Sequence, residues 1–298
     1  MKQTKLRTDI IKQNKNISFP VGTAITVQKY SKKLDFEQIF GDYKKRGINL
    51  TKLLEALLSY RLSENLSTTK AGDWINRSPV LSHFKLKEFN ERALFRLLEK
   101  VGKNYEEIIF SIQNALFQNY DFPHTNINLD WTSLVLWGQH ADLAKYGYSR
   151  EHRPDKKQIM VGIAELADPI NIPFGLTIQP GNLNDQTHFK KTYKQIEPHL
   201  IEDSRIVFDK GAQSKDNLDM VLAGKMKYLS AKKLNTSDDK RIKTFSKSKA
   251  TLIKPEEEVY GIKKEYPNRV DYFYFSEQLK KDKRTLKNSV FLKFSNFN

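Results

Sequence analysis

The sequence predicts an α+β or α/β protein with a central mixed sheet, a helical region before it and a basic, mainly extended region after it. Three observations predict this. Apolar residues recur at helical spacing before residue 120, they alternate in short segments after it, and turn residues separate those segments. The 298 residues are 39% hydrophobic and 11% aromatic, which is enough for a packed core and excludes a wholly disordered chain.

The first 120 residues predict helices. A leucine stripe at residues 53–62 predicts an amphipathic helix with Thr51 as its N-cap. A second helix is expected from about Glu88 to Lys100, where Gly102 ends it, and a third is expected to open with a capping box at Asn104. Helices with basic outer faces suit either DNA contact or a packing role. No spacing indicates a helix-turn-helix, so both roles stay open.

The pattern changes near Asp121. In the segment TNINLDWTSL, Ile127, Leu129 and Trp131 share one face and Asp130 lies on the other, which predicts a strand. The elements expected next are strands at 158–167 and 174–179, a helix at 185–199, a strand at 204–209, a helix capped by Ser214, and a strand at 227–230.

This order of three strands, helix, strand, helix and strand is the RNase H-like order. The first three strands are expected to form an antiparallel meander, and the strands reached through helices are expected to lie parallel. We therefore expect three regions: a helical region at 1–120, with DNA binding or packing as its role, an RNase H-like catalytic core at 121–230, and an incomplete, basic, insertion-type region at 231–298 with an extended segment at 270–275.

Composition limits the function. The formal net charge is +16, with basic flanks around a mildly acidic centre, which favours a polyanionic partner such as nucleic acid. The alternative is a solvated surface with a lysine bias. The chain has no cysteine, so disulfides, thiolate zinc sites and cysteine nucleophiles are excluded. No apolar stretch predicts a membrane span and no secretory signal follows the first lysines, so a cytoplasmic protein is expected.

Two aspartates are the candidate catalytic and metal-binding residues. Asp130 lies on the polar face of the first strand and Asp209 ends the fourth, and these strands are neighbours in an RNase H-like sheet. Two close carboxylates repel unless a cation lies between them, and Mg²⁺ accepts such ligands. A pair of Mg²⁺ ions can then support phosphodiester cleavage. The alternative is that each aspartate only caps a turn or faces solvent.

Four spaced motifs carry a resemblance to a known family. They are GYSREHRPDKKQ (147–158), VGI (161–163), PGNLND (180–185) and FDKGAQSKDNLDM (208–220). In this order they resemble the DDE transposases of the insertion-sequence-four family. The resemblance implies that Asp130 and Asp209 are the first and second catalytic acids. It also implies Mg²⁺ or Mn²⁺ as cofactor, transposon ends and target DNA as partners, and a homodimer acting on paired ends.

The family's third acid is a glutamate within a Tyr-x2-Arg-x3-Glu-x6-Lys pattern. Glu277 fits it poorly, because the arginine and tyrosine positions hold Phe273 and Val270, and Arg284 stands at the lysine position. The resemblance thus implies a transposase truncated before its third acid, with impaired strand transfer. Two rival functions remain: a metal-dependent DNA nuclease, and a non-catalytic DNA-binding remnant. A basic structural protein without a site is a third.

A basic cluster is expected between the first two strands. Arg150, Arg153, Lys156 and Lys157 are the candidate DNA-binding residues, through contacts with phosphates near the metals. The alternative is a charged hairpin in solvent. His152 is a weak candidate metal ligand because no other histidine accompanies it. Trp131 and Trp137 are expected in the core. Trp74 is also expected there, with a stacking platform as the alternative.

Overall fold

The computed structural model describes residues 19–41, 43, 47–122, 126–138, 141–168, 170–232, 236, 238, 250–267, 269–276 and 290–295. The chain divides into two compact units, Met1–Tyr120 and Asp121–Asn298. Each is described by itself. Glu277 lies outside the described residues.

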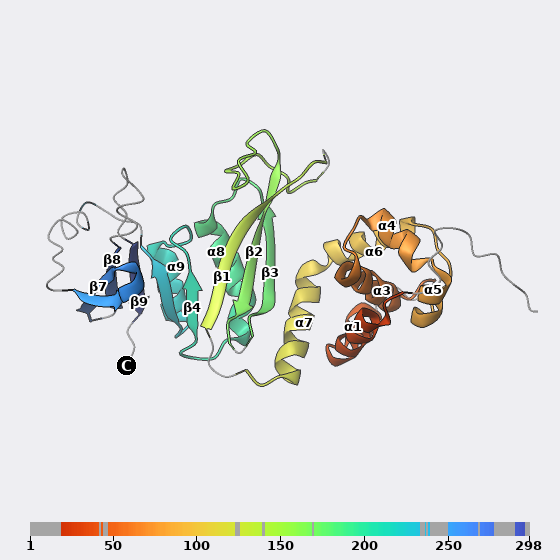
Figure 1. Cartoon of the computed structure of the whole chain (residues 1–298), viewed down its shortest axis with the longest axis horizontal. Helices are drawn as coiled ribbons and strands as arrows, with labels where there is room; N and C mark the ends of the chain where they lie inside the picture. The colour runs from red at the N-terminus through yellow and green to blue at the C-terminus, as the bar shows by residue number, and fades with distance from the viewer. Residues whose placement is uncertain are drawn as a thin grey trace, which may run out of the picture. The chain divides into compact units, whose positions relative to one another are not determined.

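The described part of the first unit is helical (Figure 1). Its helices are α1 (Val21–Lys33), α2 (Phe36–Gly41), α3 (Leu50–Ser63), α4 (Thr68–Ile75), α5 (Ser78–Phe84), α6 (Arg92–Lys103) and α7 (Tyr105–Asn119). Their apolar faces meet in one core that includes Leu53, Tyr60, Trp74 and Phe84. Burial of such side chains stabilises the fold by roughly 1.5–3 kcal/mol each.

The helix ends differ from those expected. Asn49, and not Thr51, caps α3, since the Asn49 side chain accepts a hydrogen bond from the Lys52 amide. Helix α6 begins at Arg92, several residues later than predicted, and continues past Gly102 to Lys103. The capping box at Asn104 does not form, because the Asn104 side chain donates to the Lys100 carbonyl instead.

The second unit is built on one mixed sheet. Its first five strands are β1 (Asn126–Val135), β2 (Gln158–Leu166), β3 (Ile172–Pro180), β4 (Arg205–Phe208) and β5 (Lys227–Ala231). They lie in the order β3-β2-β1-β4-β5. Strands β1, β2 and β3 pair antiparallel, whereas β4 pairs parallel with β1 and with β5. This order and these directions are those of an RNase H-like fold, as the sequence predicts.

Two helices connect the parallel strands. Helix α8 (Asp185–Ile196) follows β3 and packs against β2 and β3, and α9 (Lys215–Ala223) follows β4 and packs against β5. Asn184 caps α8 by accepting from the Thr187 amide, and Ser214 caps α9 by accepting from the Asn217 amide, as predicted for Ser214. Helix α8 ends at Ile196, three residues earlier than predicted, and residues 197–199 form a 3-10 turn after it.

Four later strands extend the same sheet. They are β6 (Thr251–Lys254), β7 (Val259–Tyr266), β8 (Arg269–Ser276) and β9 (Val290–Ser295). Strand β9 pairs antiparallel with β5 on one side and with β8 on the other, so the full order is β3-β2-β1-β4-β5-β9-β8-β7-β6. The extended segment expected at 270–275 is thus an interior strand of this extension.

Within the described residues, no helix has the length and apolar character needed to cross a membrane.

Candidate active site at the ends of β1 and β4

The register between β1 and β4 brings Asp130 and Asp209 together. The last pair in the ladder is Leu129 opposite Phe208, and the next residue after each of them is Asp130 and Asp209, respectively. Neighbouring strands lie about 4.8 Å apart, so their backbones are adjacent here. Leu129 is buried, and the alternation along β1 therefore directs Asp130 to the opposite, exposed side of the sheet.

Both aspartates use only one carboxylate oxygen within the described structure. Oδ1 of Asp209 accepts hydrogen bonds from the amides of Gly211, at 2.9 Å, and Ala212, at 3.2 Å. Oδ1 of Asp130 accepts from the amide of Trp131, at 2.8 Å. For the Oδ2 atoms no hydrogen-bond partner is found among the described residues. Each carboxylate is therefore oriented by the backbone and keeps an oxygen free for an external ligand.

A third carboxylate, Asp185, lies beside the pair, although it was not among the residues predicted from the sequence. Burial of Asp185, at the first residue of α8, raises its pKa; the negative charges of Asp209 and Asp130 raise the pKa further, and Arg150 opposes them. Its signal in the sequence was its place directly after the N-cap of α8, within the motif PGNLND.

Gly211 keeps the space between these acids open. A Cβ on Gly211 would lie 2.7 Å from Oδ2 of Asp185 and 3.0 Å from Oδ1 of Asp209. No side chain larger than hydrogen fits there without moving a carboxylate. In the turn after β4, backbone amides therefore fix Asp209, and the missing side chain of Gly211 leaves room for the carboxylate of Asp185.

Arg150 connects the loop between β1 and β2 to this site. Its Nη2 lies 2.6 Å from Oδ2 of Asp185, and its Nη1 donates to the carbonyl of Trp131, the residue after Asp130. Arg150 was predicted to contact DNA; here its guanidinium already bridges the first strand and α8. A guanidinium has five N–H donors, so some remain available.

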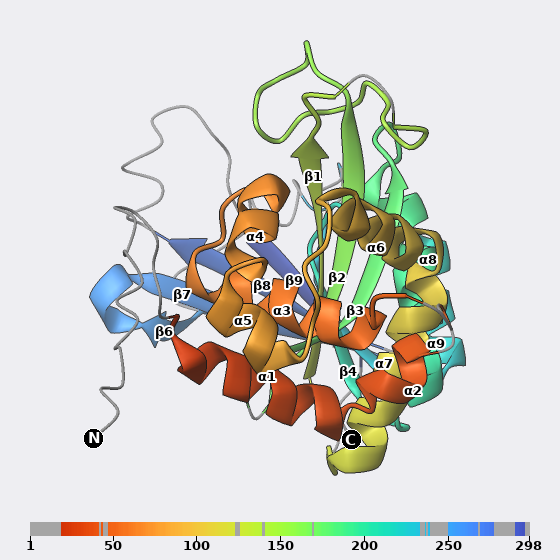
Figure 2. The same cartoon turned by 90° about the vertical axis from the view of Figure 1, so that its right-hand side faces the viewer.

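The other predicted basic residues lie further along the same loop, which projects beyond the ends of the strands (Figures 1 and 2). Arg153 forms a two-point hydrogen bond with Asp155, at 2.9 and 2.8 Å, and Lys156 lies 3.9 Å from the same carboxylate. The Arg153 hydrogen bond lowers the pKa of Asp155 to about 2. Lys157 precedes β2, where its carbonyl accepts from the Leu136 amide.

The three tryptophans differ in environment. Trp74 and Trp131 are buried, each 1% exposed, as predicted. The expectation for Trp137 is wrong, since it is 73% exposed on the loop. It lies just past the end of β1, and two cations are close to it: Arg153 and Lys156 each lie 4.9 Å from its ring centre.

A buried polar network supports β1 from the side of α8. The indole Nε1 of Trp131 donates to Oγ1 of Thr192 at 3.0 Å, Thr192 lies 2.8 Å from Oγ1 of Thr177, and Thr177 lies 2.8 Å from Nε2 of His188. Burial lowers the pKa of His188 to about 4, with Lys191 adding to the effect. The neutral imidazole therefore completes a network that holds the strand bearing Asp130.

The carboxylates provide the oxygen ligands that a hard divalent cation prefers. Across the described part of the chain, no group of three or more His, Asp or Glu side chains is placed to hold a metal ion. His152 accordingly belongs to no such group; it is an exposed residue in the left-handed region, with φ of 56°. The donors that fit are Asp130 and Asp209, each with one oxygen uncommitted.

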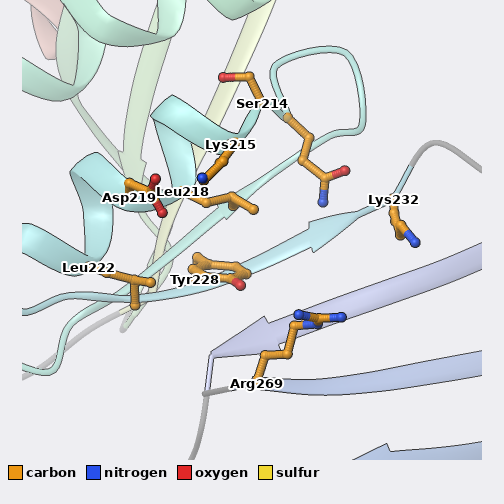
Figure 3. Close-up of a pocket in the computed structure, with 9 residues that line it drawn as sticks. Ser214, Lys215, Leu218, Asp219, Leu222, Tyr228, Lys232 and Arg269 are labelled. Atoms are coloured by element: carbon orange, nitrogen blue, oxygen red, sulfur yellow. The ribbon is translucent and has the colours of Figure 1, made fainter. Parts of the chain in front are cut away.

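A separate cavity of about 370 Å³ lies between α9, β5 and β8 (Figure 3). Tyr228, Lys232 and Arg269 line it, and the two candidate acids do not. Lys232 pairs with Asp238 at 2.7 Å and Nε of Arg269 lies 3.1 Å from Asp271, while the other lining cation, Lys215, is matched in charge by the lining acid Asp219. The cavity therefore has little net charge with which to attract an anion.

The strand order and the acids at the ends of β1 and β4 define the class of this protein, which is RNase H-like. The sequence model of the Transposase DDE domain family matches residues 122–288, more than half of the chain. The chain therefore belongs to the Transposase DDE domain family. Among curated proteins, no sequence matches.

Solved structures with some similarity are distant. A piggyBac transposase synaptic complex with hairpin DNA has 14% identity and a TM-score of 0.47, over 84% of this chain and 51% of that chain. A Mos1 transposase paired-end complex with left transposon end has 12% identity and a TM-score of 0.24, over 62% of this chain and 60% of that chain. The chain thus spans between half and two thirds of these two proteins.

Proposed function

We propose that this chain acts on DNA as a transposase, by metal-dependent cleavage of transposon ends and transfer of the freed strand into target DNA. The observation that carries the proposal is the register of β1 and β4, which makes Asp130 and Asp209 neighbours in a chain of the Transposase DDE domain family. The likeness to the insertion-sequence-four group supports the same reaction and suggests a homodimer acting on paired ends.

Asp130 and Asp209 would hold Mg²⁺ or Mn²⁺ through their uncommitted oxygens. Bound there, such ions activate an attacking oxygen and stabilise the leaving oxygen of a phosphodiester. The protein's own contribution is orientation. The amides of Gly211 and Ala212 fix Asp209, while Arg150 holds Asp185 beside the pair and neutralises part of its charge.

The loop between β1 and β2 would contact the DNA backbone. Arg153, Lys156 and Lys157 provide positive charge on this loop. Arg150, on the same loop, pairs with Asp185 beside the candidate acids. Contacts of this kind position the substrate and carry no sequence information. We propose that the helical unit, residues 1–120, adds further DNA contacts.

Glu277, the candidate that fits the family's third acid poorly, lies outside the described residues. Cleavage without joined products would favour the nuclease, and DNA binding without cleavage would favour the non-catalytic remnant.

The test of the proposal is a gel assay with DNA carrying the element's own ends, in Mg²⁺ or Mn²⁺. Asp130→Asn and Asp209→Asn are expected to remove cleavage and to weaken Mn²⁺ binding measured by calorimetry. Asp203→Asn is the matched control, because Asp203 is an exposed acid two residues before β4, at the opposite end of that strand. Equal activity and equal Mn²⁺ binding in all four proteins would refute the proposal.

A further inference from the structure

The loop at 136–157 exposes an unusual amount of aromatic surface. Trp137 is 73% exposed, Tyr146 is 61% exposed and Tyr148 is 85% exposed. Large aromatic side chains contribute most when they are covered, so three exposed ones on one loop favour a role in binding a partner. The buried side chains of this unit show that the sheet has a core of its own, which these three do not join.

The surroundings of Trp137 indicate the charge of that partner. The guanidinium of Arg153 and the ammonium of Lys156 both lie 4.9 Å from the centre of its ring. Asp155 fixes Arg153 through two hydrogen bonds and neutralises only one of the two cations. A ring that is 73% exposed and has two cations close to it suits a ligand that has both a flat apolar face and negative charge. A nucleic acid strand has both.

The form of the nucleic acid follows from the chemistry of stacking. In a duplex both faces of an internal base are already covered by its neighbours, so an indole ring gains little from it. An unpaired base has a free face, and stacking on an aromatic side chain then favours binding whatever the base is. A second copy of this chain or another protein would also cover aromatic side chains, but the cations of the loop would then need acids opposite them.

We propose that Trp137 is a stacking platform for an unpaired DNA base, and that Arg153 and Lys156 contact the phosphates that flank this base. The inference rests on the proposed function in one respect only, namely that the ligand is DNA.

The position of Trp137 limits where the unpaired base lies. Trp137 is seven residues beyond Asp130, and at about 3.3 Å per residue this separates them by at most ~23 Å. A strand advances about 3.4 Å per nucleotide, so the stacked base is expected within about seven nucleotides of the reacting phosphate.

Trp137 itself reports the contact. Of the three tryptophans in the chain, Trp74 and Trp131 are buried, so quenching of tryptophan fluorescence by DNA reports chiefly on Trp137. Three probes are compared: a single-stranded oligonucleotide, the same sequence as a duplex, and an abasic strand of equal charge. The single strand is expected to quench strongly, and the abasic strand is expected to bind with little quenching.

Affinities of variants complete the test. Trp137→Ala is expected to weaken binding of the single strand about tenfold, with binding of the duplex and the abasic strand unchanged within about twofold. Trp137→Phe is expected to retain most of the affinity. Ile170→Ala is the control, because Ile170 is 71% exposed in the turn between β2 and β3 and its removal deletes a similarly exposed apolar side chain.

Three results would overturn the inference. If Trp137→Ala binds single strands and abasic strands as the wild type does, Trp137 does not stack on a base, although the proposed function survives. If the variant instead loses self-association, the loop contacts a second copy of the chain. If the wild type binds no DNA at low salt, both the inference and the proposed function fail.

Discussion

The carboxylate of Asp185 is in an unfavourable electrostatic position unless Arg150 is present. Partial burial raises its pKa, the guanidinium of Arg150, 2.6 Å away, lowers it, and Asp209 and Asp130 raise it further. Without Arg150, the charge of Asp185 would be uncompensated next to the candidate metal site. Arg150 therefore stabilises the ionised form of Asp185 even before DNA is bound.

We therefore predict that Arg150→Gln raises the pKa of Asp185 further, because the variant keeps the hydrogen-bonding ability but loses the opposing charge. The measurement is a carboxyl titration by nuclear magnetic resonance. Lys190→Gln is the control, since Lys190 lies on the same helix and is 3.7 Å from Asp216. A pKa of Asp185 that is unchanged in Arg150→Gln would contradict the electrostatic account.

Gly162 is a second residue whose size decides the packing around the site. A Cβ there would lie 2.6 Å from Oγ1 of Thr177, 2.7 Å from Oγ1 of Thr192 and 2.8 Å from Nε1 of Trp131. We predict that Gly162→Ala lowers the free energy of unfolding by about 2 kcal/mol, because the network must shift. Urea denaturation measures it. Gly138→Ala is the control, since nothing lies within 4 Å of its Cβ, and it is expected to change stability by less than about 0.5 kcal/mol.

At the scale of elements, the hydrogen bonds that join α8 to β1 and β3 include a buried histidine, His188, which bonds Thr177 of β3. The pKa of His188 is about 4 in the folded chain, below the ordinary value of 6.5. The unfolded chain therefore binds more protons between these values. Stability is fully present above about pH 6.5 and falls as the pH decreases towards 4, and the total loss is on the order of 3 kcal/mol.

We predict that urea unfolding at pH 5 shows a loss of about 2 kcal/mol relative to pH 7 from this residue, and that His188→Gln removes this part of the pH dependence. His83→Gln, in the helical unit, is the control. If the two variants depend on pH in the same way, His188 is not responsible for the loss.

The elements also show how far the sequence predicts structure. Strands β1 to β5 were predicted closely, because each alternates or is apolar between clear turn residues. Helices α1, α2, α4 and α5 were not predicted. Three of them have eight residues or fewer, and α1 buries only Ala24, Val27 and Ser31, so their periodicity is weak.

Among the candidate site residues, Asp130 and Asp209 were predicted to be neighbours from the strand order, which does not depend on the positions of side chains. Asp185 was missed because it comes close to them only through the packing of α8 and the gap at Gly211. The prediction that Trp137 is buried was wrong, because the type of a residue predicts burial only on average and loop residues follow no periodic pattern.

At the scale of the whole molecule, the net charge of +16 predicts DNA binding that depends strongly on salt. The logarithm of the affinity is expected to fall linearly with the logarithm of the salt concentration. Lys156→Ala combined with Lys157→Ala is expected to reduce the slope by about 2, because each lysine that contacts a phosphate releases about one counterion.

Fluorescence anisotropy with labelled duplex at several salt concentrations measures this slope. Lys225→Ala is the control, since Lys225 lies in a turn after α9 and is 3.4 Å from Glu202. An unchanged slope in the double variant would show that the two lysines do not contact phosphates.

The position of β9 has a consequence for folding during translation. Residues 227–231 pair on one side with β4, made earlier on the ribosome, and on the other side with residues 290–295, made some sixty codons later. During that interval the outer edge of β5 exposes unpaired amide and carbonyl groups, the kind of edge on which nascent chains aggregate. Translation through this stretch is therefore the step at which we expect a chaperone to be needed most.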